Sequence, residues 1–146
     1  MSHNKKLTVL LVEDEPADAH LARLAFEEGQ VLADLHHVPD GVEAFAFLRR
    51  EGAYAAAPAP DLILLDLNMP RMDGRQFLQK IKDDPLLHMI PVVILTTSNA
   101  ERDMLHSYDH SAAGYIVKPV DVDAFIKIVR GIGDYWINIV HLPERS

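Results

Sequence analysis

Four short apolar runs recur along the chain, and each ends in residues that carry chemistry. In chain order, the runs and the residues that follow them are Leu7 to Val12 with Glu13 and Asp14, Leu62 to Leu65 with Asp66, Val92 to Leu95 with Thr96, and Tyr115 to Val117 with Lys118. Longer segments of helical periodicity separate the runs, a pattern typical of βα units around a parallel sheet. Because the carboxyl ends of parallel strands meet at one edge, we expect these polar residues to converge.

That edge is where open α/β sheets bind their ligands. Two carboxylates about 4 Å apart repel by about 4 kcal/mol at an effective dielectric of about 20, and a divalent cation relieves this repulsion. Magnesium suits the edge best, because it takes one or two carboxylates and fills its shell with water and phosphate oxygens. The Lys118 ammonium and the Thr96 hydroxyl would complement the remaining charge of a phosphoryl group.

Five βα units fit the chain. The predicted strands are Leu7 to Val12, Ala33 to His37, Leu62 to Leu65, Val92 to Leu95 and Gly114 to Val117; helices are predicted from about Pro16, around Val42 to Leu48, over Gly74 to Lys82, over Ala100 to His110 and from about Asp121. In the first helix, Leu21, Leu24, Ala25 and Phe26 have core-facing spacing. Glycine and two prolines predict that Glu51 to Pro60 is a loop.

Length and charge restrict the function. The 146 residues, 49% of them hydrophobic, predict one domain over residues 1–146, with a core at about 7–130 and an extended last helix to about 142. We expect no fused DNA-binding module. The formal charge of −8 argues against a nucleic-acid partner. The absence of cysteine and of a long apolar run near the start predicts a cytoplasmic protein without a membrane span.

Taken singly, these residues have ordinary explanations. Glu15 and Asp18 favour the positive end of the first helix. Thr96 has the residue type of a helix N-cap, and Lys118 that of a surface lysine. His36 and His37 are neighbours in a strand, so their side chains point to opposite faces and form no common site.

Together, the residues and their spacing resemble the receiver domain of two-component response regulators over nearly the whole chain. The resemblance implies that Asp66 is phosphorylated, that Asp14 binds magnesium directly and that Glu13 acts through coordinated water. It also implies that the Asn68 carbonyl binds magnesium, that the Lys118 to Pro119 peptide is cis, and that Thr96 and Tyr115 are the switch hydroxyl and switch aromatic. Thr97 stands where many members carry alanine or glycine, and we expect it to shield the phosphoryl group.

The resemblance is closest to single-domain receivers that partner bacterial phytochrome histidine kinases. Its features are the long loop at 51–60, the stretch His106 to His110 and the ending Asp134 to Pro143. None of these features touches the phosphoryl chemistry, so they concern the partner and assembly.

We therefore expect a doubly wound α/β domain with five parallel strands in the flavodoxin-like order 2-1-3-4-5. A histidine kinase would phosphorylate Asp66 with Mg²⁺ as cofactor, and the fourth helix, fifth strand and fifth helix would form the switch face. The protein would be a signalling domain rather than an enzyme, apart from slow self-dephosphorylation. The alternatives are a phosphorelay intermediate and a phosphate-independent binding module. An aspartyl-phosphate phosphatase would need a second aspartate at position 68, where Asn68 stands.

The last helix carries more apolar residues than one face requires. Val122, Phe125, Val129, Ile132, Trp136 and Val140 form one stripe, whereas Ile126, Ile128, Tyr135, Ile137 and Ile139 lie off it. Exposed patches of this kind usually mark an interface, so we expect a homodimer with Phe125, Trp136 and Ile139 at its contact. The alternative is that the segment folds back over its own domain.

Overall fold

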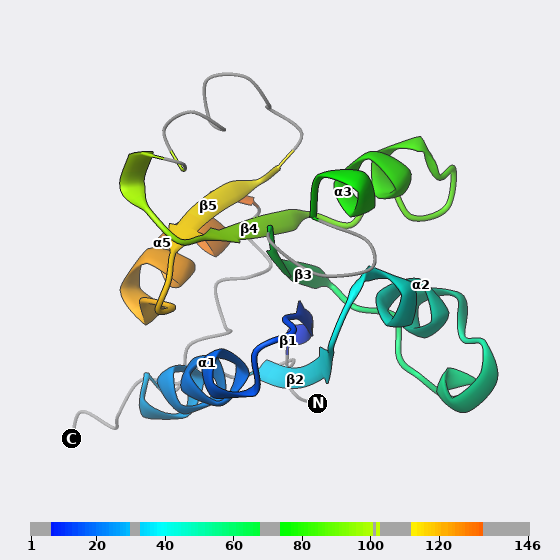
Figure 1. Ribbon diagram of the computed structural model, residues 1–146, viewed down its shortest axis with the longest axis horizontal. Coiled ribbons are helices and arrows are strands. Elements are labelled where there is room, and N and C mark those ends of the chain that lie inside the picture. Colours follow the sequence, from blue (N-terminus) through cyan, green and yellow to red (C-terminus); the bar gives the residue numbers. More distant parts are fainter. Residues whose placement is uncertain (1–6, 30–32, 68–73, 101, 103–111, 133–146) are drawn as a thin grey trace, which may run out of the picture.

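One parallel sheet organises the molecule. The computed structural model describes residues 7–29, 33–67, 74–100, 102 and 112–132. The strands within these ranges are β1 (Leu7–Val12), β2 (Ala33–Val38), β3 (Leu62–Asp66), β4 (Val92–Thr96) and β5 (Gly114–Val117). They pair in the order β2-β1-β3-β4-β5, which confirms the predicted fold (Figure 1).

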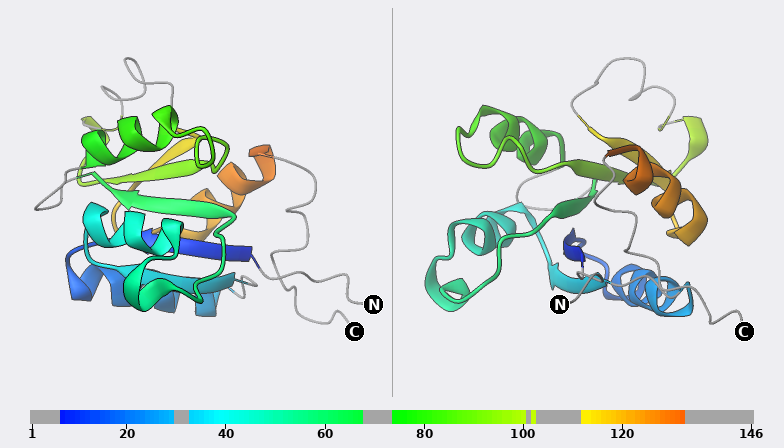
Figure 2. Two further views of the ribbon diagram at one scale, coloured as in Figure 1. Left: turned by 90° about the vertical axis from the view of Figure 1, so that its right-hand side faces the viewer. Right: turned by 180° about the vertical axis from the view of Figure 1, so that it is seen from behind.

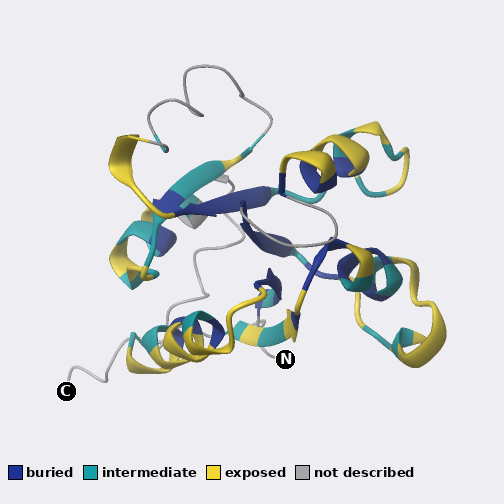
Figure 3. Ribbon diagram, in the orientation of Figure 1, coloured by how far each residue is buried: buried dark blue, intermediate teal, exposed yellow. Residues whose placement is uncertain are grey.

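Helices cover both faces of this sheet. One face carries α1 (Pro16–Glu28) and α5 (Val122–Ile132), and the other carries α2 (Gly41–Arg49) and α3 (Gly74–Asp83) (Figure 2). All residues of β3 and β4 are buried, as are most of those of β1 (Figure 3). Strands that are covered on both sides need nearly continuous apolar sequence, which explains the apolar runs of these segments.

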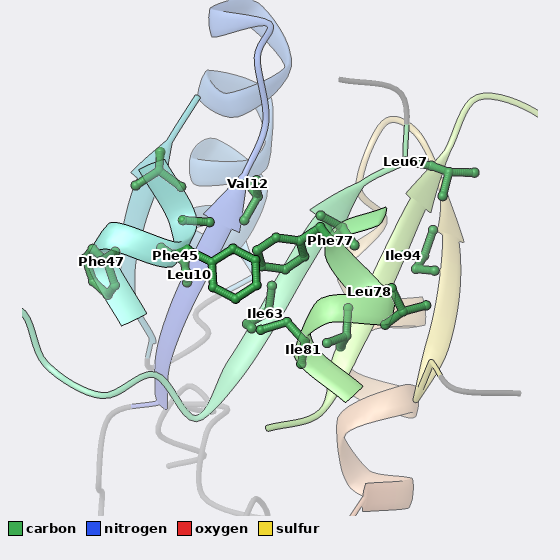
Figure 4. Packing of buried hydrophobic residues seen from close by; sticks show 14 residues of the cluster. Leu10, Val12, Phe45, Phe47, Ile63, Leu67, Phe77, Leu78, Ile81 and Ile94 are labelled. Atoms are coloured by element: carbon green, nitrogen blue, oxygen red, sulfur yellow. The ribbon is translucent and has the colours of Figure 1, made fainter. Parts of the chain in front are cut away.

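Two hydrophobic clusters fill the layers between sheet and helices. On the α1 and α5 face, the rings of Phe26 and Phe125 lie 4.6 Å apart between centroids. On the α2 and α3 face, the rings of Phe45 and Phe77 lie 5.0 Å apart and pack over the sheet (Figure 4). Such aromatic pairs contribute about 0.5–1.5 kcal/mol beyond their buried area. They hold the helices that flank the polar edge.

The buried face of α1 differs from the predicted one. Leu21 is 47% exposed and Leu24 is 36% exposed, whereas Ala19, Ala22 and Phe26 are buried. At about 100° per residue, Leu24 lies roughly 200° round the helix from Phe26, so the two side chains cannot share one face. Phe26 is fixed by its contact with Phe125, and this contact sets the rotation of the helix. The prediction was therefore right for Phe26 and wrong for both leucines.

The predicted loop at 51–60 contains a short 3-10 helix, η1 (Gly52–Tyr54). Its Tyr54 hydroxyl donates a hydrogen bond to Glu43 Oε1 at 2.7 Å, and its ring lies 5.5 Å from that of Phe47. Both partners belong to α2, whose N-cap residue Asp40 accepts a hydrogen bond from the Glu43 backbone N–H. The segment is thus attached to α2, and its location is set by Tyr54.

Candidate functional site

Three carboxylates meet at the carboxyl edge of the sheet. In the register of β1 with β3, Val12 lies opposite Leu65, so Glu13 and Asp66 leave their strands at the same level. One carboxylate oxygen from each of Glu13, Asp14 and Asp66 lies within 4.8 Å of the others. Glu13 and Asp66 are buried, whereas Asp14 is exposed. The predicted convergence of these side chains therefore occurs in the fold.

Lys118 approaches the carboxylates from the end of β5. Its Nζ lies 3.0 Å from Glu13 Oε1, 3.0 Å from Asp18 Oδ2 and 3.4 Å from Asp66 Oδ2. Burial alone would lower the pKa of Lys118, but hydrogen bonds to Glu13 and Asp18 and the charge of Asp66 raise this pKa above its ordinary value. The side chain is therefore a fixed cation beside Asp66.

The acidic triad of Glu13, Asp14 and Asp66 has the composition of a magnesium site. Three carboxylates face the one ammonium of Lys118, which also pairs with Asp18, so the site carries a net negative charge that a divalent cation would offset. Glu13 Oε1 is buried and accepts no hydrogen bond, although the Lys118 ammonium is nearby. An all-oxygen donor set with one exposed member, Asp14, suits an ion that keeps several waters.

Thr96 lies at the end of β4, beside the triad in the sheet order. It is buried, and its hydroxyl donates a hydrogen bond to the Ser98 carbonyl at 3.2 Å. The following helical residues begin at Asn99, and Ser98 accepts the backbone hydrogen bond of Arg102. Thr96 thus precedes the first helical residue by three positions and has no N-cap role, which removes the ordinary explanation for this threonine.

Tyr115 occupies the middle of β5, opposite Ile94 of β4. It is half-buried and packs against the cluster on the α2 and α3 face. Thr96 and Tyr115 therefore stand on adjacent strands. The peptide bond from Lys118, the residue after β5, to Pro119 is cis, as expected.

One predicted interface residue is a core residue. Phe125 is fully buried between α5, α1 and the sheet, so its side chain cannot contact a second protein at the surface. Ile126 and Ile128 are partly buried against the same cluster, which reduces the apolar surplus expected for this helix. Asn68, Trp136 and Ile139 lie outside the described residues, as does most of the predicted helix at 100–110.

Two contacts at the site involve residues that the sequence had assigned elsewhere. Asp18, expected to act only on the helix dipole, forms an ion pair with Lys118. His37 places its Nε2 2.7 Å from the Glu13 carbonyl oxygen, next to the backbone hydrogen bond from Glu13 N–H to the Val38 carbonyl. For the His37 contact, the sequence offers one signal: His36 and His37 are neighbours in a strand, so His37 points to the opposite face from His36. For the Asp18 contact with Lys118, the sequence pattern gives no indication.

No helix in the described part of the chain is both long enough and apolar enough to cross a membrane.

Known proteins resemble the chain over nearly its full length. It is 41% identical over 140 residues to the response regulator Rcp1 of Synechocystis, covering 96% of this chain and 95% of that protein. It is 46% identical to the phosphorylated cyanobacterial phytochrome response regulator RcpA, whose crystal structure gives a TM-score of 0.70 over 96% of this chain and 100% of that one. The bacteriophytochrome response regulator RtBRR is 35% identical, with a TM-score of 0.81 over 97% of this chain and 85% of that one. The model of the response regulator receiver domain matches residues 9–130, and the chain therefore belongs to the response regulator receiver domain family.

Proposed function

We propose that Asp66 accepts a phosphoryl group from the phosphohistidine of a histidine kinase. One observation carries this proposal. The Asp66 carboxylate is buried at the end of β3, within 4.8 Å of the Glu13 and Asp14 oxygens and 3.4 Å from the Lys118 ammonium. The nucleophilic oxygen of Asp66 therefore lies beside both the acidic ion site and the Lys118 cation.

The transfer exchanges one bond to phosphorus for another. An Asp66 oxygen attacks the phosphorus as the phosphorus–nitrogen bond to the kinase histidine breaks, and the histidine nitrogen keeps the electron pair. Lys118 offsets the negative charge on the transferring oxygens. Receiver domains bind Mg²⁺ at this acidic pocket; here Glu13, Asp14 and Asp66 would hold it, and it would supply further positive charge. The buried wall of β1 and β3 limits access of water to Asp66.

Thr96 and Tyr115 connect the phosphorylated site to the rest of the domain. In the register of β4 with β5, Thr96 lies opposite Val117, the last residue of β5. Tyr115 lies on β5 two residues before Val117. A change in the Thr96 hydroxyl contact would alter the packing of β5 and of the helix that follows it. Phosphorylation would then favour one of two conformations of the predicted switch face, to which β5 and α5 belong.

The kinase partner is proposed to be a bacteriophytochrome. RcpA and RtBRR are described as a phytochrome and a bacteriophytochrome response regulator, and their alignments cover most of this chain. Self-association through the C-terminal segment belongs to the same proposal. It is supported by the apolar residues of the sequence beyond position 132.

Phosphotransfer tests the proposed function. A histidine kinase labelled with radioactive phosphate should pass the label to this chain in Mg²⁺, and Asp66→Asn should receive none. Asp123→Asn, which changes an exposed acid on α5, is the matched control and should be labelled like the parent. Full labelling of Asp66→Asn, or full labelling in excess chelator, would refute the assignment.

The choice of kinase tests the proposed partner. Bacteriophytochrome kinases should transfer the phosphoryl group to this chain faster than unrelated histidine kinases, and equal rates would refute a bacteriophytochrome partner.

A further inference from the structure

We propose that Asp18 is a positioning residue that occupies the Lys118 ammonium and thereby weakens the affinity of the site for a phosphoryl group. This inference rests on the proposed function of Asp66. Asp18 lies in the first turn of α1, outside the acidic triad of Glu13, Asp14 and Asp66. Its contact with the site is the ion pair with Lys118.

The hydrogen bonds of Lys118 show the competition. Nζ donates to Glu13 Oε2 at 3.1 Å and to Asp18 Oδ2 at 3.0 Å, whereas Asp66 Oδ2 lies farther away at 3.4 Å. An ammonium has three N–H donors, so these two hydrogen bonds leave one donor for Asp66 or a group attached to it. Asp18 therefore takes up one N–H donor of Lys118 that would otherwise be available for a hydrogen bond to a phosphoryl oxygen.

The burial of the pair sets how strongly Asp18 competes. The Lys118 side chain is only 16% exposed, which limits screening of its charge, whereas the Asp18 side chain is 36% exposed. A partly exposed ion pair contributes about 0.2–1 kcal/mol, and this range corresponds to about a 1.4- to fivefold change in an equilibrium constant. We therefore expect removal of the Asp18 charge to strengthen phosphoryl binding by a factor in that range.

Asp18 also lies near the positive end of the α1 dipole, where any acid is favourable. Glu15 separates this general effect from the contact with Lys118. It is the N-cap residue of the same helix and is exposed, so Glu15→Gln removes one negative charge from the same helix end and leaves the Asp18 to Lys118 pair intact. A purely electrostatic effect of net charge would appear equally in both variants.

The test measures binding of beryllofluoride, a phosphoryl mimic, to the full chain in Mg²⁺ by isothermal titration calorimetry. Asp18→Asn keeps the size of the side chain and removes its charge, and Asp18→Ser is a second uncharged replacement. Both should bind beryllofluoride about 1.4- to fivefold more tightly than the parent, whereas Glu15→Gln should change the affinity less. Asp18→Glu retains the charge and should bind more weakly than Asp18→Asn.

Increased affinity cannot result from a damaged fold, so the sign of the change is informative. Unchanged or weaker binding by Asp18→Asn and Asp18→Ser would overturn the inference, as would an equal gain in Glu15→Gln. If the parent bound beryllofluoride and was labelled on Asp66, such a result would leave the proposed function intact. If the parent neither bound the mimic nor was labelled, the proposed function and this inference would fail together.

Discussion

The backbone N–H of Lys118 donates a hydrogen bond to the Thr96 carbonyl oxygen at 2.8 Å. This bond joins the ends of β4 and β5. Lys118, the cation of the site, and Thr96, the residue proposed to sense phosphorylation, are therefore linked directly through the backbone. A shift at either residue is transmitted to the other through the backbone. The geometry favours concerted movement of the two strand ends over independent side-chain changes.

The acidic triad should respond to Mg²⁺ with a change in stability. Because a ligand that binds only the folded state stabilises it, Mg²⁺ should raise the unfolding temperature of the parent. Asp14→Asn should be more stable than the parent in chelator, because it relieves repulsion with Glu13 and Asp66, and should gain less from Mg²⁺. Thermal unfolding with and without the ion measures both effects, with Asp123→Asn as control. An equal response of the parent and Asp14→Asn to Mg²⁺ would contradict the predicted ion site.

Thr97 should protect the phosphorylated protein from hydrolysis. It is an exposed residue directly after Thr96, and its branched side chain is larger than the alanine or glycine common in the family. We expect Thr97→Ala to shorten the lifetime of phosphorylated Asp66, because attacking water gains access. The loss of label after removal of the phosphodonor gives the rate, and Asn99→Ala, an exposed change two residues on, should leave it unaltered. An unchanged or slower rate in Thr97→Ala would end the shielding argument.

Gly74 packs against the backbone of the residues that end β3, so it has no space for a side chain. Its N–H donates to the Leu67 carbonyl at 2.8 Å, and an added Cβ would lie 2.6 Å from Leu67 Cα. Backbone atoms cannot yield as a side chain can, so Gly74→Ala should destabilise the fold by about 1–3 kcal/mol and slow phosphorylation by displacing Leu67 next to Asp66.

Gly52→Ala is the matched comparison for Gly74→Ala. No heavy atom would contact its Cβ within 4 Å, but its φ of +57° is unfavourable for alanine, at a cost of about 1–2 kcal/mol. Denaturant unfolding should therefore show losses in both variants, whereas only Gly74→Ala should affect labelling of Asp66. A Gly74→Ala protein that is labelled at the parental rate would show that Leu67 does not position the aspartate.

The sequence predicted the strands and their polar ends well because burial on both faces requires apolar runs, which are interrupted only by Thr8 in β1 and end in polar residues in β3 and β4. The sequence did not predict which face of α1 is buried. The apolar residues of this helix allow two buried faces, and the contact of Phe26 with Phe125 selects one of them. The ion pair of Asp18 with Lys118 joins residues 100 positions apart. No local pattern encodes such a contact, and a plausible local role, at the helix end, concealed it.

Tyr54 should contribute to stability in a pH-dependent manner. Its hydrogen bond to Glu43, together with burial and the nearby acid charges, raises the pKa of Tyr54 from 10.0 to about 12. A folded-state pKa above the unfolded value means that the contribution is complete below about pH 10 and is lost as the pH rises through about 12. We therefore expect Tyr54→Phe to lose about 1 kcal/mol at pH 8, a difference that shrinks at alkaline pH.

Denaturant unfolding and the ultraviolet absorbance of tyrosinate measure the Tyr54 effect. Glu43→Gln keeps Tyr54 but replaces the carboxylate whose hydrogen bond is the main cause of the raised pKa, so the pKa of Tyr54 in this variant should lie closer to 10. If Tyr54→Phe were as stable as the parent at pH 8, the attachment of η1 to α2 would not depend on this hydrogen bond.

Self-association remains a prediction for the C-terminal segment. Phe125 is excluded from the contact by its burial, which leaves Trp136 and Ile139 as the proposed interface residues, and a single tryptophan in the chain makes Trp136 a convenient probe. We expect the parent to sediment as a dimer at tens of micromolar, because apolar side chains on more than one face of a helix favour a second copy. Trp136→Ala with Ile139→Asp should shift it to monomer, whereas Leu86→Asp, at a residue 86% exposed in the segment between α3 and β4, should not. A monomeric parent, phosphorylated or not, would instead support a C-terminal segment folded over its own domain.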